Sequence, residues 1–233
     1  PSFFSWGPFT MDADGLSIEV TKGRGDNAET ADEWVASPFE VLGATRDGSG
    51  REWGKWLRWR DGDGREHLRH VSEAALQGEP SAVCSMLASD GLRIDRVHQK
   101  ALVSYLCSVA PKGRVTLVSR TGWHAIAGRD VFVLPGQVLG PRGSENVILD
   151  GAAIGPYEAR GTLADWQKGV GALAADHALA VLSISAALAG PLLHLAGLEG
   201  GGLNFYGPSS KGKTTVLNAG ASVWGRGGSP GYV

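Results

Sequence analysis

The chain has 233 residues, a formal net charge of −2 and 20% charged residues, a composition typical of a globular protein with one or two domains and a sizeable core. The near-zero charge excludes a global basic field for nucleic acid, so any nucleic-acid surface has to be a local patch. Cys84 and Cys107 lack C-x-x-C spacing and no signal peptide is recognisable at the start, which favours reduced thiols and a cytoplasmic protein.

The first part of the chain is predicted to be rich in antiparallel strands. One short strand is expected at Leu16–Val20, within a Gly-rich and polar leader. Stronger β patterns cover 37–44, 53–60 and 67–71, and Asp-Gly turns separate them. Short strands joined by such turns are typical of hairpins. The sequence therefore predicts a three-stranded antiparallel meander.

The middle strand of this meander mixes aromatic and basic residues. Alternation places Trp56, Arg58 and Arg60 on one face of the strand, and such a mixture can stack bases and contact phosphates. The alternative is a half-buried strand whose tryptophans belong to the core and whose arginines face water. We favour this alternative because aromatic residues are common in strands.

Helices and a second group of strands follow. Ser72, Pro80 and Asp95 are placed to begin three helices, and Cys107 in the third is interpreted as a small hydrophobic residue. Strands are expected at 114–118, 122–124, 131–134 and 146–149. His124 is interpreted as a histidine held by a backbone partner and not as a catalytic group, because no nucleophile or carboxylate pattern accompanies it.

An apolar stretch begins after a short helix that Thr162 is predicted to cap. The uncharged run 178–198 is about long enough to span a bilayer. Its many Ala and Ser residues, the Gly190-Pro191 pair, and Asp176 and Glu199 on either side argue against a membrane span. We expect a buried helix packed beneath the sheet of an ATPase domain.

The most informative motif is G-x-x-x-x-G-K-T at 207–214, between a predicted strand at 203–206 and a predicted helix. Gly207 and Gly212 let the backbone turn so that N–H groups point at phosphate oxygens. Lys213 is predicted to reach the β- and γ-phosphates and Thr214 to offer its hydroxyl to Mg²⁺, which makes them the catalytic pair. The predicted ATP-binding residues are Gly207, Pro208, Ser209, Ser210, Lys211, Gly212, Lys213, Thr214 and Thr215.

A P-loop ATPase also needs an apolar strand that ends in an acidic residue and follows the P-loop helix. No such strand precedes Val233. We therefore expect a fragment of a longer protein, one that binds nucleotide weakly and hydrolyses it poorly on its own.

Several motifs, which occur along the chain in the same order as in a known family, carry a resemblance to that family. They are Ser37-Pro38-Phe39-Glu40-Val41, Leu57-Arg58-Trp59-Arg60-Asp61, Gly64-Arg65-Glu66-His67, Arg120-Thr121-Gly122-Trp123-His124, Phe132-Val133-Leu134-Pro135, the run from Asn204 to Thr215, and Ala221-Ser222-Val223-Trp224-Gly225. Over about residues 38–225 the chain resembles the family known as domain of unknown function 927, whose bacterial members are often carried by prophages and mobile elements.

The resemblance implies an ATP-driven motor on DNA, similar to ring-forming helicases of the AAA+ type. The P-loop roles carry over to Gly207, Gly212, Lys213 and Thr214, because these positions match. The acidic residue of the second ATPase motif and an arginine finger do not carry over, since no residue of this chain matches them.

Together these features predict an α/β protein with two parts. Residues 1–158 are expected to form an α+β N-terminal region with antiparallel strands and a DNA-binding or assembly role. Residues 159–233 are expected to form the start of a P-loop ATPase domain. The expected ligands are ATP and Mg²⁺, and the expected partners are single-stranded DNA and further copies in a homo-oligomeric ring. Two other functions stay open from the motif alone: a small-molecule kinase, and a module in which nucleotide binding only orders an assembly.

Overall fold

The structure is a computed structural model that describes residues 4–23, 29–143, 145–150, 157 and 159–225. The chain divides into two compact units. The first unit consists of residues 1–119 and 142–151, and the second unit consists of residues 120–141 and 152–233. Residues 120–141 thus belong to the same unit as the P-loop. The architecture is mixed α/β, as the sequence predicts.

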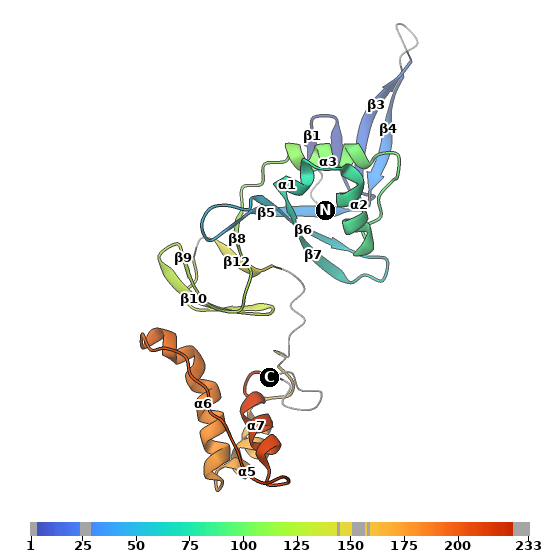
Figure 1. Ribbon diagram of the computed structural model, residues 1–233. Coiled ribbons are helices and arrows are strands. Elements are labelled where there is room, and N and C mark those ends of the chain that lie inside the picture. Colours follow the sequence, from blue (N-terminus) through green and yellow to red (C-terminus); the bar gives the residue numbers. More distant parts are fainter. Residues whose placement is uncertain (1–3, 24–28, 144, 151–156, 158, 226–233) are drawn as a thin grey trace. The chain divides into compact units, whose positions relative to one another are not determined.

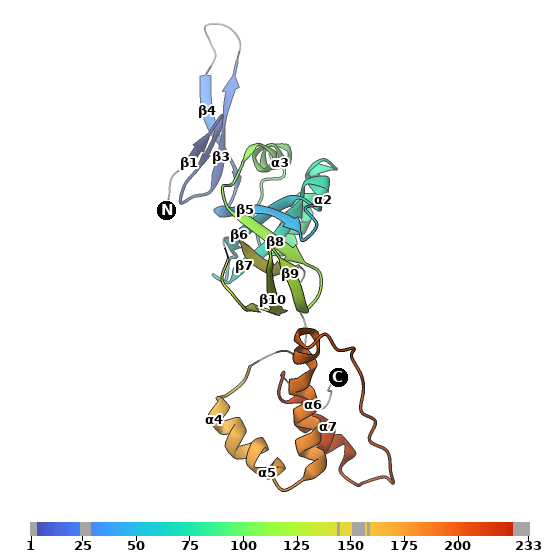
Figure 2. The ribbon, with the colours of Figure 1, turned by 90° about the vertical axis from the view of Figure 1, so that its left-hand side faces the viewer.

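A four-stranded antiparallel sheet opens the first unit, in the order β1-β2-β3-β4. Its strands are β1 (Phe4–Trp6), β2 (Phe9–Met11), β3 (Leu16–Lys22) and β4 (Glu29–Ala36). Figure 2 shows β3 and β4 as a long hairpin. The predicted strand at Leu16–Val20 is confirmed as β3. Its partner β4 was not predicted, because its first half is polar and lacks clear alternation.

The second sheet of this unit has the order β12-β8-β5-β6-β7. Its strands are β5 (Phe39–Asp47), β6 (Gly54–Arg60), β7 (Glu66–Ser72), β8 (Arg114–Val118) and β12 (Asn146–Leu149). The predicted meander is confirmed as β5-β6-β7, in which both pairs are antiparallel. Strand β8 joins β5 in parallel, and β12 joins β8 in parallel. The chain between β7 and β8 is helical. This helical segment belongs to the long connection that the parallel pair β5 and β8 requires.

Three helices form this crossover, and Figure 1 shows them close to β5, β6 and β7. They are α1 (Glu73–Leu76), α2 (Pro80–Ser89) and α3 (Gln99–Ser108). Ser72 caps α1 by accepting a hydrogen bond from the Ala75 N–H at 3.1 Å, and Pro80 opens α2, both as predicted. The core between helices and sheet includes Leu57, Leu102 and Leu106, each fully buried.

One expectation for α3 is wrong. The helix begins at Gln99 and not at Asp95, because residues after Asp95 form a turn in which the His98 N–H donates to the Asp95 carbonyl at 3.2 Å. Cys107 is exposed, whereas Cys84 on α2 is buried. The buried face of α3 is centred on Leu102 and Leu106, and Cys107 lies beyond the edge of this face.

His98 links α3 to the first sheet through two carboxylates. Its Nδ1 lies 2.5 Å from an Asp95 oxygen and its Nε2 lies 2.6 Å from an oxygen of Glu33 on β4. Glu33 also forms an ion pair with Lys22 of β3. Hydrogen bonds to Asp95 and Glu33 raise the pKa of His98, although partial burial opposes them. The His98 ring therefore holds the β3–β4 hairpin to the start of α3 best when protonated.

The second unit contains a three-stranded antiparallel sheet, in the order β11-β10-β9, and a helical part. The strands are β9 (Gly122–Ile126), β10 (Arg129–Leu134) and β11 (Gln137–Leu139). The helices are α4 (Leu163–Trp166), a π-helical turn η2 (Gln167–Gly171), α5 (Ala172–Ala174), α6 (Ala178–Leu195) and α7 (Lys213–Ala221). Thr162 caps α4 as predicted, accepting from the Asp165 N–H at 3.2 Å.

Helix α6 corresponds to the long apolar run, and the expectation that it is buried is wrong. Only Ala180 and Ser183 of this helix are buried. Among the residues that the structure describes, α6 is the one helix long and apolar enough to cross a membrane, and one such helix is weak evidence for a span. Figures 1 and 2 show α7 beside α6. The contact is close at Gly220, where an added Cβ would come within 2.4 Å of Ser183 Oγ.

Two tryptophans bind the backbone of α6 around Pro191, which lies inside the helix. Proline has no N–H, so the carbonyl four residues earlier, that of Ala187, loses its helical donor. The Trp224 indole donates to this carbonyl at 2.8 Å, and the Trp123 indole donates to the Pro191 carbonyl at 2.7 Å. These bonds connect α6 to the segment after α7 and to β9.

The predicted strand at 203–206 is not formed. Within the described range 159–225, these residues pair with no neighbouring strand and have no regular structure. Alternating apolar residues favour an extended chain, but a strand also needs a partner for its backbone N–H and C=O groups.

The His98 network predicts a pH-dependent contribution to stability. The pKa of His98 is raised in the folded state. Protonated His98 therefore contributes its full stabilisation of the fold below about pH 6.5, which is the pKa of a histidine in the unfolded chain. This contribution is lost as pH rises through the folded-state pKa. His98→Gln should therefore flatten the fall in melting temperature as pH rises above about 6.5, measured by circular dichroism. Equal slopes of melting temperature against pH for wild type and His98→Gln would contradict the prediction.

Trp224→Phe is predicted to destabilise the second unit by about 1 kcal/mol, because the Ala187 carbonyl loses its donor while the ring packing is largely retained. Denaturant unfolding followed by circular dichroism measures the effect. Trp53→Phe is the matched control, since its indole donates to the exposed Gly50 carbonyl of a hairpin turn. An equal decrease in the free energy of unfolding in the two variants would argue against a special role for the bond at the Ala187 carbonyl.

Candidate nucleotide-binding site

The P-loop residues 207–212 form a turn that leads directly into α7. Gly207 has φ +146°, Ser210 has φ +59° and Gly212, the N-cap residue of α7, has φ +79°. Nothing lies within 4 Å of a Cβ added at Gly207 or Gly212. Glycine is therefore favoured at both positions by the backbone conformation and not by lack of space.

Lys213, the first residue of α7, folds back over this turn. Its Nζ donates to the carbonyls of Gly207 at 2.9 Å and Pro208 at 2.6 Å. One ammonium group thus bonds both carbonyls at the start of the loop and stands beside the start of the helix. A group in this position can exchange carbonyl oxygens for phosphate oxygens without a change in the course of the backbone.

The N-terminus of α7 supplies the other donors. The Val216 N–H bonds to the Gly212 carbonyl at 3.0 Å, so the N–H groups of Lys213, Thr214 and Thr215 precede the first helical bond. Such groups lack an acceptor within the helix and, with the helix dipole, form an anion site. Together with the Lys213 ammonium and the Thr214 hydroxyl, they fit a triphosphate with its magnesium ion.

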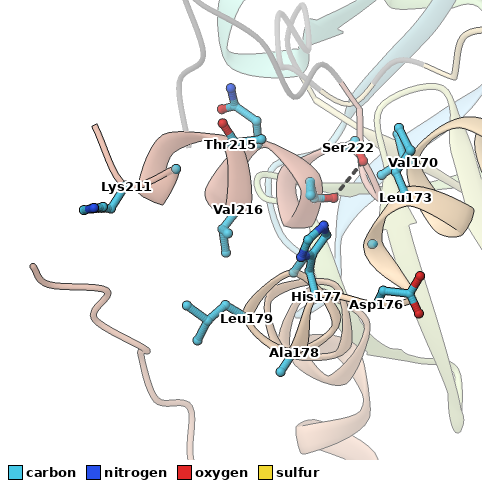
Figure 3. A pocket seen from close by; sticks show the side chains of 15 residues that line it. Val170, Leu173, Asp176, His177, Ala178, Leu179, Lys211, Thr215, Val216 and Ser222 are labelled. Carbon is cyan, nitrogen blue, oxygen red and sulfur yellow. Dashed lines mark hydrogen bonds between the residues drawn. The ribbon is translucent and has the colours of Figure 1, made fainter. Parts of the chain in front are cut away.

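A large hollow adjoins the loop within the second unit (Figure 3). It has a volume of about 960 Å³ and lies between α7 and the segment from η2 to the first turn of α6. Lys211, Gly212 and Thr215 of the P-loop region belong to its lining. A smaller hollow of about 340 Å³ is bordered by residues 204–208 and Lys213. The phosphate loop therefore lies between two hollows.

The wall of the large hollow is fixed to α7 by a tryptophan. The Trp166 indole of α4 donates to Ser222 Oγ at 2.9 Å, and Ser222 Oγ donates to the Ala219 carbonyl at 2.7 Å. Ser222 follows α7 and Trp166 precedes η2, so these bonds set the spacing between the two sides of the hollow.

The predicted nucleic-acid face on β6 is not available as a whole. Trp56 is only 8% exposed and packs with Val115 and Leu117, so its ring has no free face for a base, as the alternative interpretation of this strand holds. Arg58 forms an ion pair with Glu40 at 2.6 Å, and Arg60 donates to the Gly64 carbonyl at 2.9 Å. A role of Arg58 and Arg60 in DNA binding stays a prediction.

Other candidate groups of the sequence have structural partners. His124 Nε2 lies 2.8 Å from the Arg120 carbonyl, which confirms the backbone-partner interpretation. In the part of the chain that the structure describes, no group of three or more His, Cys, Asp or Glu residues could hold a metal ion.

Sequence reasoning missed the residues across from the P-loop. His177 and Leu179 line the large hollow, but they lie in an apolar run without a motif. Val170 and Leu173 also line it, and the shared helical face of Trp166, Val170 and Leu173 was the only signal that could have indicated this wall.

Comparisons with known proteins identify a similar fold and a family. The active helicase Cch of SCCmec type IV has a similar fold, with a TM-score of 0.71 and 20% sequence identity. The match covers 97% of this chain and 42% of the helicase chain, so the chain spans less than half the length of that protein. At this identity the likeness shows the fold alone. No match is found among curated proteins. The model of the family described as domain of unknown function DUF927 matches residues 9–233, and the chain belongs to that family.

Proposed function

We propose that this chain is the ATP-binding part of a DNA-dependent ATPase of helicase type, from a replication protein of a phage or mobile element. The observation that carries the proposal is the Gly212 cap with Lys213 folded over the loop at the start of α7. The similar fold of a SCCmec helicase supports it. In this proposal residues 159–233 belong to the ATPase domain and residues 1–158 serve DNA binding or assembly.

The proposed binding mode follows from the groups present. The β- and γ-phosphates lie at the N-terminus of α7 and accept hydrogen bonds from the N–H groups of Gly212, Lys213 and Thr214. The Lys213 ammonium leaves the carbonyls of Gly207 and Pro208 and bonds the phosphates instead. Thr214 holds Mg²⁺ through its hydroxyl, and the bound ion supplies neutralisation of phosphate charge. Pro208, Ser209, Ser210, Lys211 and Thr215 complete the loop around the phosphates.

The motor function is proposed for the full-length protein in the cytoplasm. In this proposal, hydrolysis also requires an acidic residue that positions the attacking water, and it is completed between subunits of a homo-oligomeric ring. The ring moves along single-stranded DNA, whose backbone and bases are held by basic and aromatic side chains. Arg58 and Arg60 are candidates for such contacts.

Lys213→Ala in the full-length protein should abolish ATP turnover stimulated by single-stranded DNA, since no other side chain of the loop supplies an ammonium at this position. Phosphate release with and without DNA measures the effect. Lys168→Ala is the matched control, because Lys168 is an exposed lysine on η2, and it should retain turnover.

Turnover that survives Lys213→Ala would show that the site assignment is wrong. A full-length protein that binds ATP but hydrolyses none with or without DNA would favour the assembly module over the motor. Phosphate transfer to a small acceptor would favour a kinase.

A further inference from the structure

The large hollow beside the P-loop combines features that a phosphate site alone does not need. Its lining includes large apolar side chains that are open to solvent: Leu173 is 76% exposed and Leu179 is 57% exposed. Figure 3 shows Val216 on α7 directed toward the first turn of α6, where Leu179 lies beside it. Exposed leucines facing a shared hollow are covered favourably by a flat apolar group.

The hollow is continuous with the phosphate loop. Gly212 and Thr215 belong to its lining and also to the backbone that cradles phosphates in the proposed function. A nucleotide bound at the N-terminus of α7 must place its base and ribose on one side of the loop. The hollow of about 960 Å³ has the dimensions of a small-molecule site.

The edge of the hollow also offers polar groups. His177, the N-cap residue of α6, has no side-chain hydrogen bond to the first turn among the bonds that the described residues make. The first turn of α6 therefore presents backbone N–H groups at Ala178 and Leu179, both of which line the hollow. Ring nitrogens of a base are acceptors that such donors can bond. Apolar walls with a few donors at the edge are the usual composition of a nucleobase site.

We propose that this hollow, between η2, α5 and the first turn of α6 on one side and α7 on the other, binds the base and ribose of the nucleotide. The inference rests on the proposed function, because it assumes that the phosphates bind at Gly212–Thr214. Leu173, Leu179 and Val216 contact the base. Trp166 is a positioning residue that sets the width of the hollow through its bond to Ser222.

The test compares two ligands that share phosphates and differ in the nucleoside. Calorimetric titration of the full-length protein with ATP and with inorganic tripolyphosphate, both in Mg²⁺, measures the contribution of the base and ribose directly. ATP should bind at least about tenfold more tightly than tripolyphosphate. Leu173→Asn and Leu179→Asn should each weaken the binding of ATP about tenfold and leave the binding of tripolyphosphate unchanged, since a lost apolar contact affects the base alone.

Leu163→Asn is the matched control. Leu163 lies on α4, is 70% exposed and is not among the residues that line the hollow, so this variant should bind both ligands as wild type does. Leu173 lines the large hollow and not the smaller one, so its variant also separates these two places for the base. Because all three leucines are exposed, their substitution leaves the core intact.

The outcomes separate this inference from the proposed function. If wild type binds ATP and tripolyphosphate equally, or if Leu173→Asn and Leu179→Asn leave ATP binding unchanged, the hollow is not the base site, although the phosphate site stands. If both variants weaken the binding of ATP and of tripolyphosphate equally, the substitutions act on the P-loop, and the inference is also overturned. If neither ligand binds, or if Lys213→Ala binds both as wild type does, the proposed function fails and the inference with it.

Discussion

A proline inside α6 creates the constraint on which the arrangement of the second unit depends. Pro191 cannot donate to the Ala187 carbonyl, and the Trp224 indole supplies that bond at 2.8 Å. Because Trp224 follows α7 closely, the bond holds the end of the P-loop helix against α6. The close approach of Gly220 to Ser183 sets the distance between the same two helices. The phosphate loop at the other end of α7 is therefore positioned by contacts remote from it.

The tryptophans of the family motifs act as donors to fixed backbone positions. Trp123 donates to the Pro191 carbonyl and stacks on His194, with ring centroids 5.4 Å apart. Phe132 of β10 lies near both Trp123 and Trp224. An indole combines a large apolar surface with one directional donor, so it both fills space and specifies position. These contacts explain why residues 120–141 belong to the same unit as the P-loop although far from it in sequence.

In the first unit, aromatic and charged residues of β6 are likewise held by specific partners. Trp59 is buried in the core, and its indole donates to the Asp90 carbonyl at 3.0 Å. Lys55, also buried, pairs with Glu73 at 2.7 Å. Both belong to the strand that the sequence singled out as a candidate surface for nucleic acid. Helices cover one face of the sheet and further apolar residues gather on the other, so that strand contributes mainly to stability.

The sequence alone determined the features that short-range physics controls. The helix starts marked by Ser72, Pro80 and Thr162 and the Asp-Gly turns of the meander were predictable because each depends on a few neighbouring residues. The spacing of Gly207, Gly212 and Lys213 likewise identified the loop, since its chemistry requires those residue types. Only the tertiary structure decided the exposure of α6, the unpaired state of 203–206 and the wall formed by Leu173 and Leu179. Burial, strand pairing and the lining of a hollow depend on which distant segments meet, and no local pattern in the sequence records that.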